Sequence, residues 1–383
     1  MKTISARGRI VAACVGMSVS AICAPPEASV GDTWNPKKAA DYLDKRISWW
    51  MAWTAAARGQ GTFCISCHTA VPYALARPAL RGRLGEVARS TNERRLLDSV
   101  TKRVRLWNDV EPFYKDHGNG DKTTARSRGT EAVLNALILA SDDARSDRLT
   151  DETRIAFSNM WSLQRNIGNL SGSWWWLQFG NEPFEAHDSD YYGAALAAVA
   201  VGTAPENYRS TPEVQNNLKL LREYLHREYA TQSPINHIVL LWASTKWPGL
   251  VASEQQRSIM SDIVAMQQAD GGWNLASLTW TWRDWRFRSL VNMFIRSYGT
   301  PLKGKSDAYA TGVIAFALEQ AGVRSDNVTL KRAVDWLVRN QNQTEGFWQA
   351  YSLNNRRDPT SAAERFMSDA ATAYAVLALA AGN

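Results

Sequence analysis

The chain has 383 residues and a formal net charge of +7, and 45% of its residues are hydrophobic, as is usual for a folded protein. This length suits one large domain or two ordinary ones. The excess of positive charge is too small to indicate nucleic-acid binding, so we expect no nucleic acid among the partners.

Residues 1–24 have the pattern of a secretory signal peptide. Lys2, Arg7 and Arg9 precede a short apolar run from Ile10 to Ala24, which is too short for a membrane span. No later segment reaches about 18 uninterrupted apolar residues, so we expect no stable membrane span. The sequence therefore predicts a Sec-type export signal and a periplasmic or secreted protein with a single domain at residues 25–383.

The sequence Cys-Ile-Ser-Cys-His at residues 64–68 has the spacing that attaches a c-type haem. Cys64 and Cys67 can add across the two vinyl groups of haem, and His68 follows directly, so its imidazole can bind the iron as an axial ligand. The two other cysteines of the chain lie in the expected signal peptide. The sequence therefore predicts covalent haem c in the first part of the domain.

Two other uses of this motif remain open. Zinc could bind to Cys64, Cys67 and His68, or the two thiols could form a redox disulfide, although the strand–helix–strand setting typical of thioredoxin-like motifs is missing.

The second axial position of a bound haem could be filled by His, by Met or by no side chain. The distal candidates are His187, His237 and Met51.

Helical patterns dominate the chain, and two kinds of helix alternate. One kind is short, rich in alanine and leucine and apolar on nearly all sides, which indicates burial; the other is longer and charged along one face, as expected of an outer layer. The predicted inner helices are residues 68–80, 130–141, 190–202, 236–245, 307–322 and 369–382. The predicted outer helices are residues 39–53, 93–107, 152–166, 213–229, 254–268 and 330–343.

This alternation repeats six times, with a period of roughly 50 to 60 residues. Six helix pairs that close on themselves would form an all-α (α/α)6 barrel with an inner and an outer layer. Closure would bury the end repeats, which explains why no polar capping repeat is present.

A second recurrent element follows the predicted outer helices. Its clearest copies are QQADGGW at 267–273 and QNQTEGFW at 341–348, and residues 164–176 and 58–63 are looser copies. The element resembles the QW motif, Gln-x-x-x-Gly-x-Trp, of the squalene–hopene and oxidosqualene cyclase superfamily. The sharpest matching pairs are Gln267 with Trp273 and Gln343 with Trp348.

This resemblance implies the α/α toroid that terpenoid cyclases share with protein prenyltransferase β subunits and lanthionine synthetase C proteins. It also implies that the Gln and Trp of each motif stack at the end of an outer helix and tie neighbouring repeats together. Zinc sites occur in two of these groups, which is one reason for keeping zinc as an alternative. Such a fold hosts many chemistries and does not assign a function.

The residues His187-Asp188-Ser189-Asp190 resemble the Asp-x-Asp-Asp motif of class II terpene cyclases. The resemblance implies that Asp190 is a general acid that protonates an alkene, with Asp188 as the first acid and His187 as a partner that tunes its pKa. Tyr191 replaces the third acid of the motif.

Three further acids stand at or near the predicted starts of inner helices, namely Glu131, Asp307 and Asp369. Helix capping is an equally good explanation for acids in such places. In a toroid, however, these helix starts would meet at one end of the central cavity, so all three are candidate catalytic residues.

Two long connectors are rich in aromatic residues. Trp174, Trp175 and Trp176 lie in one of them, and Trp280, Trp282 and Trp285 lie in the other. Their rings could line an apolar cavity and stabilise a cation. The second connector also contains three arginines that could bind haem propionates or an anionic substrate, Arg283, Arg286 and Arg288.

These patterns support three functions. The leading one is a periplasmic haem oxidoreductase that acts on a hydrophobic or aromatic small molecule in the central cavity, with a possible periplasmic redox partner. The second is a non-redox, cyclase-like enzyme with Asp190 as its acid. The third is an electron-transfer haem protein without a substrate.

Overall fold

The computed structural model describes residues 33–381, apart from residues 119, 280–304, 354, 356 and 359. Helices dominate the described residues, which contain twelve α-helices and little sheet, so the expectation of a helical chain is confirmed. The only strands among these residues are β1 (Ala57–Arg58) and β2 (Thr62–Phe63), which pair as a small antiparallel hairpin. The predicted signal peptide lies outside the described residues.

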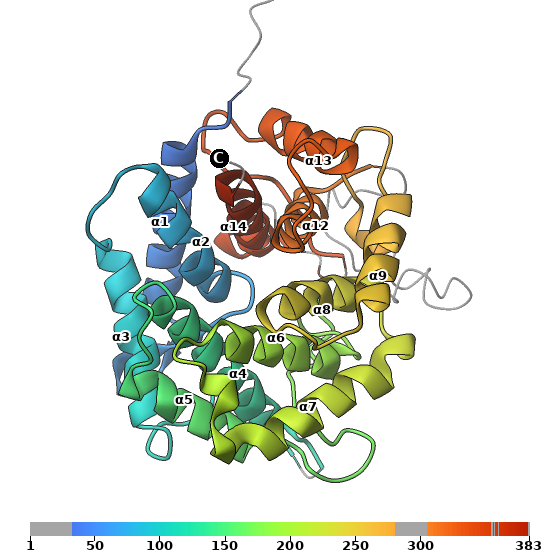
Figure 1. Ribbon diagram of the computed structural model, residues 1–383. Coiled ribbons are helices and arrows are strands. Elements are labelled where there is room, and N and C mark those ends of the chain that lie inside the picture. Colours follow the sequence, from blue (N-terminus) through green and yellow to red (C-terminus); the bar gives the residue numbers. More distant parts are fainter. Residues whose placement is uncertain are drawn as a thin grey trace, which may run out of the picture.

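Six buried helices contact one another in a closed cycle, α2 to α4, α6, α8, α12, α14 and back to α2 (Figure 1). Their bounds are α2 Ala70–Arg83, α4 Thr123–Asp143, α6 Ser189–Thr203, α8 Pro234–Lys246, α12 Ala308–Gln320 and α14 Phe366–Ala381. These six helices are called the central ring below.

The amphipathic helices pack against the outside of the central ring. They are α1 Pro36–Ala52, α3 Thr91–Arg105, α5 Asp151–Ser162, α7 Gln215–Glu228, α9 Ser253–Ala265 and α13 Val328–Arg339. The first of them, α1, contacts both α2 and α14. The first and last repeats of the sequence therefore meet beneath α1.

Three glutamines tie successive repeats together in the same way. Each side-chain amide donates one hydrogen bond to a glycine carbonyl in its own turn and another to a backbone carbonyl at the start of the next outer helix. The bonds run from Gln164 to Gly172 and Asn217, from Gln267 to Gly271 and Thr329, and from Gln341 to Gly346 and Asn35. The third tie joins the last repeat to α1 and so closes the ring.

The motif spacing favours Gln343 for this third tie, and that prediction was wrong by two residues. Gln343 is exposed, and its amide donates to the carbonyl of Gln341 at 3.3 Å. Gln341 is buried and makes both bonds of the tie, at 2.9 and 3.0 Å. The longer turn before Trp348 moves the glutamine that can reach α1 to the earlier position.

A tryptophan follows each tying glutamine and anchors the turn to the preceding outer helix. Trp174, Trp273 and Trp348 are fully buried. Their indole N–H groups donate to carbonyls in the last turns of α5, α9 and α13, at 2.6 to 2.8 Å. Each turn is thus fixed at both ends, once by its Trp and once by its Gln.

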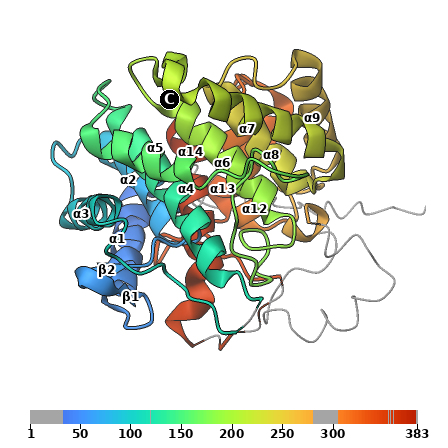
Figure 2. The ribbon, with the colours of Figure 1, turned by 90° about the horizontal axis from the view of Figure 1, so that it is seen from below.

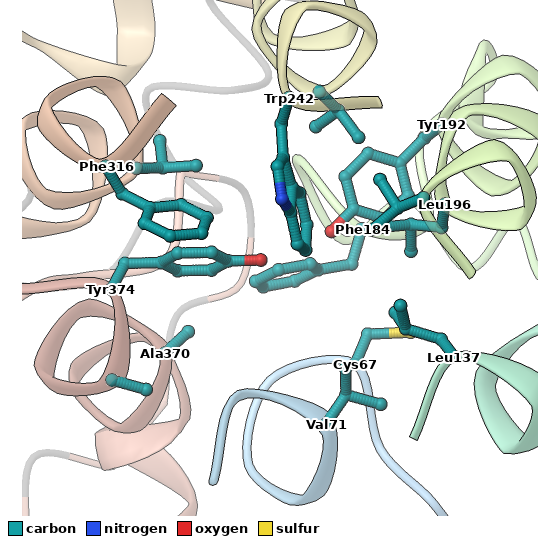
Figure 3. Packing of buried hydrophobic residues seen from close by; sticks show 14 of the residues in the cluster. Cys67, Val71, Leu137, Phe184, Tyr192, Leu196, Trp242, Phe316, Ala370 and Tyr374 are labelled. Carbon is teal, nitrogen blue, oxygen red and sulfur yellow. The ribbon is translucent and has the colours of Figure 1, made fainter. Parts of the chain in front are cut away.

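Aromatic side chains fill the middle of the central ring (Figure 3). Phe184, from the connector between α5 and α6, meets Tyr192 edge-on, and Phe316 contacts both Trp242 and Tyr374. All five side chains are buried. At this level the middle of the ring is packed core.

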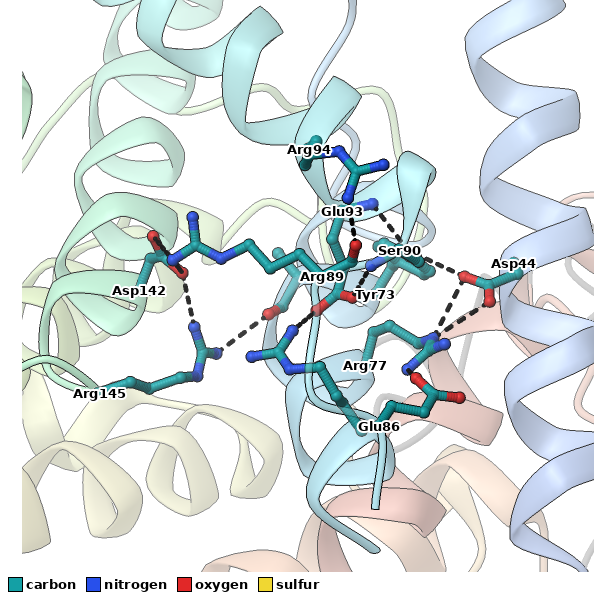
Figure 4. A network of polar contacts seen from close by, with 12 residues as sticks. Asp44, Tyr73, Arg77, Glu86, Arg89, Ser90, Glu93, Arg94, Asp142 and Arg145 are labelled. Atoms are coloured by element: carbon teal, nitrogen blue, oxygen red, sulfur yellow. Dashed lines mark hydrogen bonds and ion pairs between the residues drawn. The ribbon is translucent and has the colours of Figure 1, made fainter. Parts of the chain in front are cut away.

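A polar network holds the first repeat together (Figure 4). Arg77 of α2 is 3% exposed and pairs with Asp44 of α1 at 3.1 Å and with Glu86 at 2.7 Å. The Tyr73 hydroxyl also donates to Asp44, at 2.6 Å. These contacts fix α1 against α2, and the Cys-Ile-Ser-Cys-His motif lies in the chain between these two helices.

Candidate functional site

The motif at residues 64–68 forms the turn between β2 and α2. The N–H of Cys64 donates to the carbonyl of Ala56 at 2.8 Å, and its carbonyl accepts from the indole of Trp50 at 2.7 Å. The Ser66 hydroxyl accepts from two backbone N–H groups at the start of α2, at 3.3 and 3.1 Å. The two middle residues of the motif thus have structural roles, because Ile65 is buried in the core and Ser66 caps the helix.

Both cysteines are free and buried. The Cys67 side chain points toward the middle of the central ring, near Leu137 and Phe184 (Figure 3). Burial raises the pKa of the Cys64 thiol to about 12 and also raises that of Cys67. Reactive disulfide-exchanging thiols have lowered pKa values, so neither thiol has the electrostatic setting that the redox-disulfide alternative requires.

The His68 ring is held between two aromatic side chains. It stacks on Phe366 with 4.0 Å between ring centroids and meets Trp50 edge-on at 5.1 Å. Burial, together with the charges of Arg357 and Arg46, lowers the pKa of His68 to about 3. His68 is therefore a neutral imidazole at ordinary pH, which is the form that binds metals.

A chain of hydrogen bonds leads from His68 to the last helix of the protein. His68 Nδ1 and Thr69 Oγ1 are 2.8 Å apart, and Thr69 Oγ1 donates to Asp369 Oδ2 at 2.7 Å. Asp369 also accepts from Arg46 Nε at 2.6 Å, from Arg46 Nη2 at 3.0 Å and from the Tyr42 hydroxyl at 2.9 Å. Burial raises the pKa of the Asp369 carboxyl, and the Arg46 guanidinium opposes this rise.

This chain determines which nitrogen of His68 carries the proton. The Thr69 hydroxyl has one hydrogen, and the geometry directs it to Asp369. The hydroxyl must therefore accept from His68, which places the imidazole proton on Nδ1. Nε2 is left with its lone pair, and no described residue forms a hydrogen bond with it.

A cavity of about 200 Å³ lies beside His68. Half of its lining residues are aromatic when His68 is included, and the others are charged or polar except for one methionine. The aromatic lining residues besides His68 are Trp50, Trp53, Tyr114, Phe179, Phe184 and Phe366. The other lining residues are Asn181, Glu182, Glu185, Ser352, Arg357, Glu364 and Met367.

Among the acids that line this cavity, Glu185 is the one whose charge acts on the two cysteines of the motif. Its charge acts on both Cys64 and Cys67 and raises their pKa values. Asn181 donates a hydrogen bond to its carboxyl group, and burial raises the pKa of that group. The chain from Asn181 to Glu185 forms a small bridge that holds both residues at the cavity.

Two of the predicted acids lie in buried ion pairs. Asp369 pairs with Arg46, as described above. Glu131 pairs with Arg103, and both side chains are fully buried. Helix α4 begins at Thr123, so Glu131 lies well inside it rather than at its start, where the sequence placed it. Its contacts join α3 to α4.

The other predicted acids bind backbone or polar groups near helix starts. Asp188 accepts from Ser233 and Asn236 at the start of α8, at 2.7 and 3.1 Å. Asp190 accepts from the Trp176 N–H at 3.2 Å, and burial raises its pKa to about 6. Neither acid lines the cavity beside His68.

Asp307 caps α12 by accepting from the N–H of Ala310 at 2.9 Å, and it also accepts from Leu275 N–H. Burial raises the pKa of Asp307 to about 6. The capping explanation considered for this residue is therefore confirmed by the geometry.

None of the predicted distal ligands lines the cavity beside His68. The side chain of His187 is exposed, and Met51 is partly buried on α1. His237 stacks on Tyr229, and its Nε2 bonds to the carbonyl of that residue at 3.0 Å. Met367 lines the cavity and follows Phe366 directly, and it was not among the predicted site residues.

The aromatic connectors are described only in part. Trp174 and Trp176 are fully buried, and Trp175 lies under the side chains of Lys122 and Arg165. The other tryptophans and the arginines of the second connector lie outside the described residues, namely Trp280, Trp282, Trp285, Arg283, Arg286 and Arg288.

Comparisons with known proteins assign neither a family nor a function to this chain. No known protein family matches the chain, and no curated protein has a detectably similar sequence. Within the described ranges, no three His, Cys, Asp or Glu side chains are grouped so that they could hold a metal ion together. None of the helices in the part of the chain that the structure describes has the length and apolarity needed to cross a membrane.

Proposed function

We propose that this protein is an exported c-type haem protein and a periplasmic oxidoreductase. The observation that carries the proposal is the environment of the motif. Cys64 and Cys67 are free and lie in one turn with His68, whose unprotonated Nε2 has no partner among the described residues. This is the set of groups that covalent attachment and axial ligation of a haem require.

The fold we propose is an α/α toroid like that of terpenoid cyclases. Two observations support it: the closed cycle of contacts in the central ring and the repeated ties made by Gln164, Gln267 and Gln341. In such a toroid the motif lies at one end of the ring. The hairpin and the chain that leads into α14 lie at the same end of the molecule (Figure 2).

The residues around the motif fit a haem. His68 would bind the iron and Arg357 would pair with a propionate, and both residues line the cavity. Cys64 and Cys67, which are buried and do not line it, would form the thioethers. The cavity, at about 200 Å³, is smaller than the roughly 300–1,000 Å³ of sites that enclose a drug-sized ligand. A macrocycle attached here would therefore lie partly outside it.

A haem supplies reversible one-electron chemistry, and the chain's own residues would bind and orient a substrate beside it. Aromatic groups such as Trp53, Tyr114 and Phe179 suit a hydrophobic or aromatic small molecule. Glu185 would hold a proton at its carboxyl group, in which Asn181 fixes one oxygen. Because the middle of the ring is packed, we place the substrate at this cavity rather than at the ring's centre.

Electron transfer without a substrate is the second candidate, and the small volume of the cavity favours it. A haem edge outside the cavity would be accessible to a protein redox partner in the periplasm. The response of the reduced protein to carbon monoxide separates the two candidates. Binding of carbon monoxide indicates an open axial position and supports the oxidoreductase, whereas a six-coordinate haem that does not bind it supports electron transfer.

The test of the proposal is the visible spectrum of protein exported to the periplasm of a host that matures c-type cytochromes, with a pyridine haemochrome assay and a metal assay on the same sample. We expect one covalent haem per chain. One zinc and no haem would support the zinc alternative and overturn the proposal. A protein without either group would leave the cyclase-like alternative, in which Asp190→Asn should abolish activity.

A further inference from the structure

We infer that Thr69 and Asp369 are positioning residues that set the reduction potential of a haem bound at His68. This inference rests on the proposed function. The first repeat supplies the axial ligand, and the last repeat supplies the carboxylate that acts on it through one hydroxyl group.

The contacts are short, buried and continuous. They run from His68 Nδ1 to Thr69 Oγ1 at 2.8 Å, and from there to Asp369 Oδ2 at 2.7 Å. Thr69 is 3% exposed and Asp369 is 1% exposed. Arg46 is 5% exposed and donates to both carboxylate oxygens of Asp369, and Tyr42 donates to one of them. These bonds hold Asp369 in a fixed orientation as a hydrogen-bond acceptor.

Ordinary helix capping does not account for these two side chains. Thr69 is the N-cap residue of α2, yet its side chain makes no capping hydrogen bond, and Ser66 performs that role instead. The side-chain bonds of Asp369 within the described residues all come from α1 or from Thr69, not from its own helix. Thr69 therefore contacts His68 directly, and Asp369 acts on His68 through Thr69 from the last helix of the central ring.

The electronic consequence follows from the direction of the hydrogen bonds. When Nδ1–H donates to a hydroxyl that itself donates to a carboxylate, Nε2 becomes a better electron donor. A stronger donor stabilises the oxidised iron more than the reduced iron, so the chain of bonds lowers the potential. Partners of this kind change metal affinity by about 10- to 100-fold. A tenfold preference corresponds to about 59 mV for a one-electron couple.

Thr69→Val tests the inference, because valine has nearly the same shape and lacks the hydroxyl group. Thr69→Ser keeps the hydroxyl group and should retain the potential of the unmodified protein. Thr311→Val is the matched control, since Thr311 is also a buried threonine at the start of a central-ring helix, and its hydroxyl binds Asp307 and Trp273 instead. Thr69→Ala removes the same hydroxyl group and replaces Thr69→Val if the valine variant does not fold.

The readouts are the haem content from the pyridine haemochrome and the potential from a spectroscopic redox titration. We expect Thr69→Val to carry covalent haem with a potential raised by about 59 mV, the equivalent of a tenfold shift in the ratio of oxidised to reduced protein. Thr69→Ser and Thr311→Val should be unchanged. A haem-loaded Thr69→Val protein with an unchanged potential would overturn this inference alone. Unmodified protein without covalent haem would overturn the proposed function and, with it, this inference.

Discussion

Replacing Gln341 with alanine should weaken the closure of the ring. The Gln341 amide donates to the carbonyl of Asn35 at 3.0 Å and to that of Gly346 at 2.9 Å, and its oxygen accepts from the N–H of Asn35 at 2.7 Å. Gln341 is 4% exposed, so water cannot easily replace these partners. Asn35 also caps α1, so the loss affects the start of the helix that covers the seam.

The expected cost follows from the three lost hydrogen bonds. Each contributes about 0.5–1.5 kcal/mol of net stability, so Gln341→Ala should lower the free energy of unfolding by roughly 3 kcal/mol. Urea unfolding followed by circular dichroism measures this change. Gln343→Ala is the matched control, because Gln343 is exposed and the one described bond of its side chain is long. Its cost should stay within about 0.5 kcal/mol, as for most surface substitutions.

Equal costs for the two variants, or a larger cost for Gln343→Ala, would refute the assignment of the tie. A cost below about 0.5 kcal/mol for Gln341→Ala would show that the three bonds are not maintained in solution. Either result would also remove one of the two observations that support a closed toroid.

Three further changes test other parts of the fold. Gly322→Ala should lower the free energy of unfolding by about 1 kcal/mol, because Gly322 has a positive φ. Gly271→Ala should lower it by at least about 2 kcal/mol, since Gly271 also has a positive φ and an added Cβ would lie 2.6 Å from a carbonyl oxygen of α13. The midpoints of urea unfolding compare the two variants. Arg103→Met leaves the buried carboxylate of Glu131 without its ion-pair partner and should lower the free energy of unfolding by about 3–5 kcal/mol. Adding Glu131→Leu should restore most of this loss. Burial raises the pKa of Asp307 from 3.8 to about 6, so the folded state keeps a proton there that the unfolded state has lost, and stability should fall as pH rises through this window. Asp307→Asn keeps the helix cap, so the free energy of unfolding of this variant should fall less between pH 4 and 6. An unchanged dependence on pH would contradict the raised pKa of Asp307.

The alternation of helices could be predicted because apolar periodicity is a local property. The error at α4 shows the limit of this signal. Residues 123–129 are mostly polar and only partly buried, so the apolar pattern begins at Thr130 although the helix begins at Thr123. Glu131 consequently looked like a residue at a helix start, where a catalytic acid would be expected. The structure instead places it in a buried ion pair between two helices.

The candidate site was predictable where its residues are adjacent in sequence. Cys64, Cys67 and His68 form one motif, and its chemistry follows from the spacing. The partner of Thr69 could not be predicted in this way, because Asp369 lies 300 residues further along the chain and is brought to Thr69 only by tertiary packing. Met367 and Glu185 reach the cavity for the same reason, as products of tertiary packing.

The most direct test of the haem assignment is the intact mass of the exported protein after denaturation, which removes any haem that is not covalently bound. We predict a mass equal to that of the processed chain plus one haem. The Cys64→Ala/Cys67→Ala double variant, exported in the same host beside a known c-type cytochrome, should have the mass of the processed chain alone. An unmodified protein that also has the mass of the bare chain, while the companion cytochrome receives its haem, would contradict the central claim.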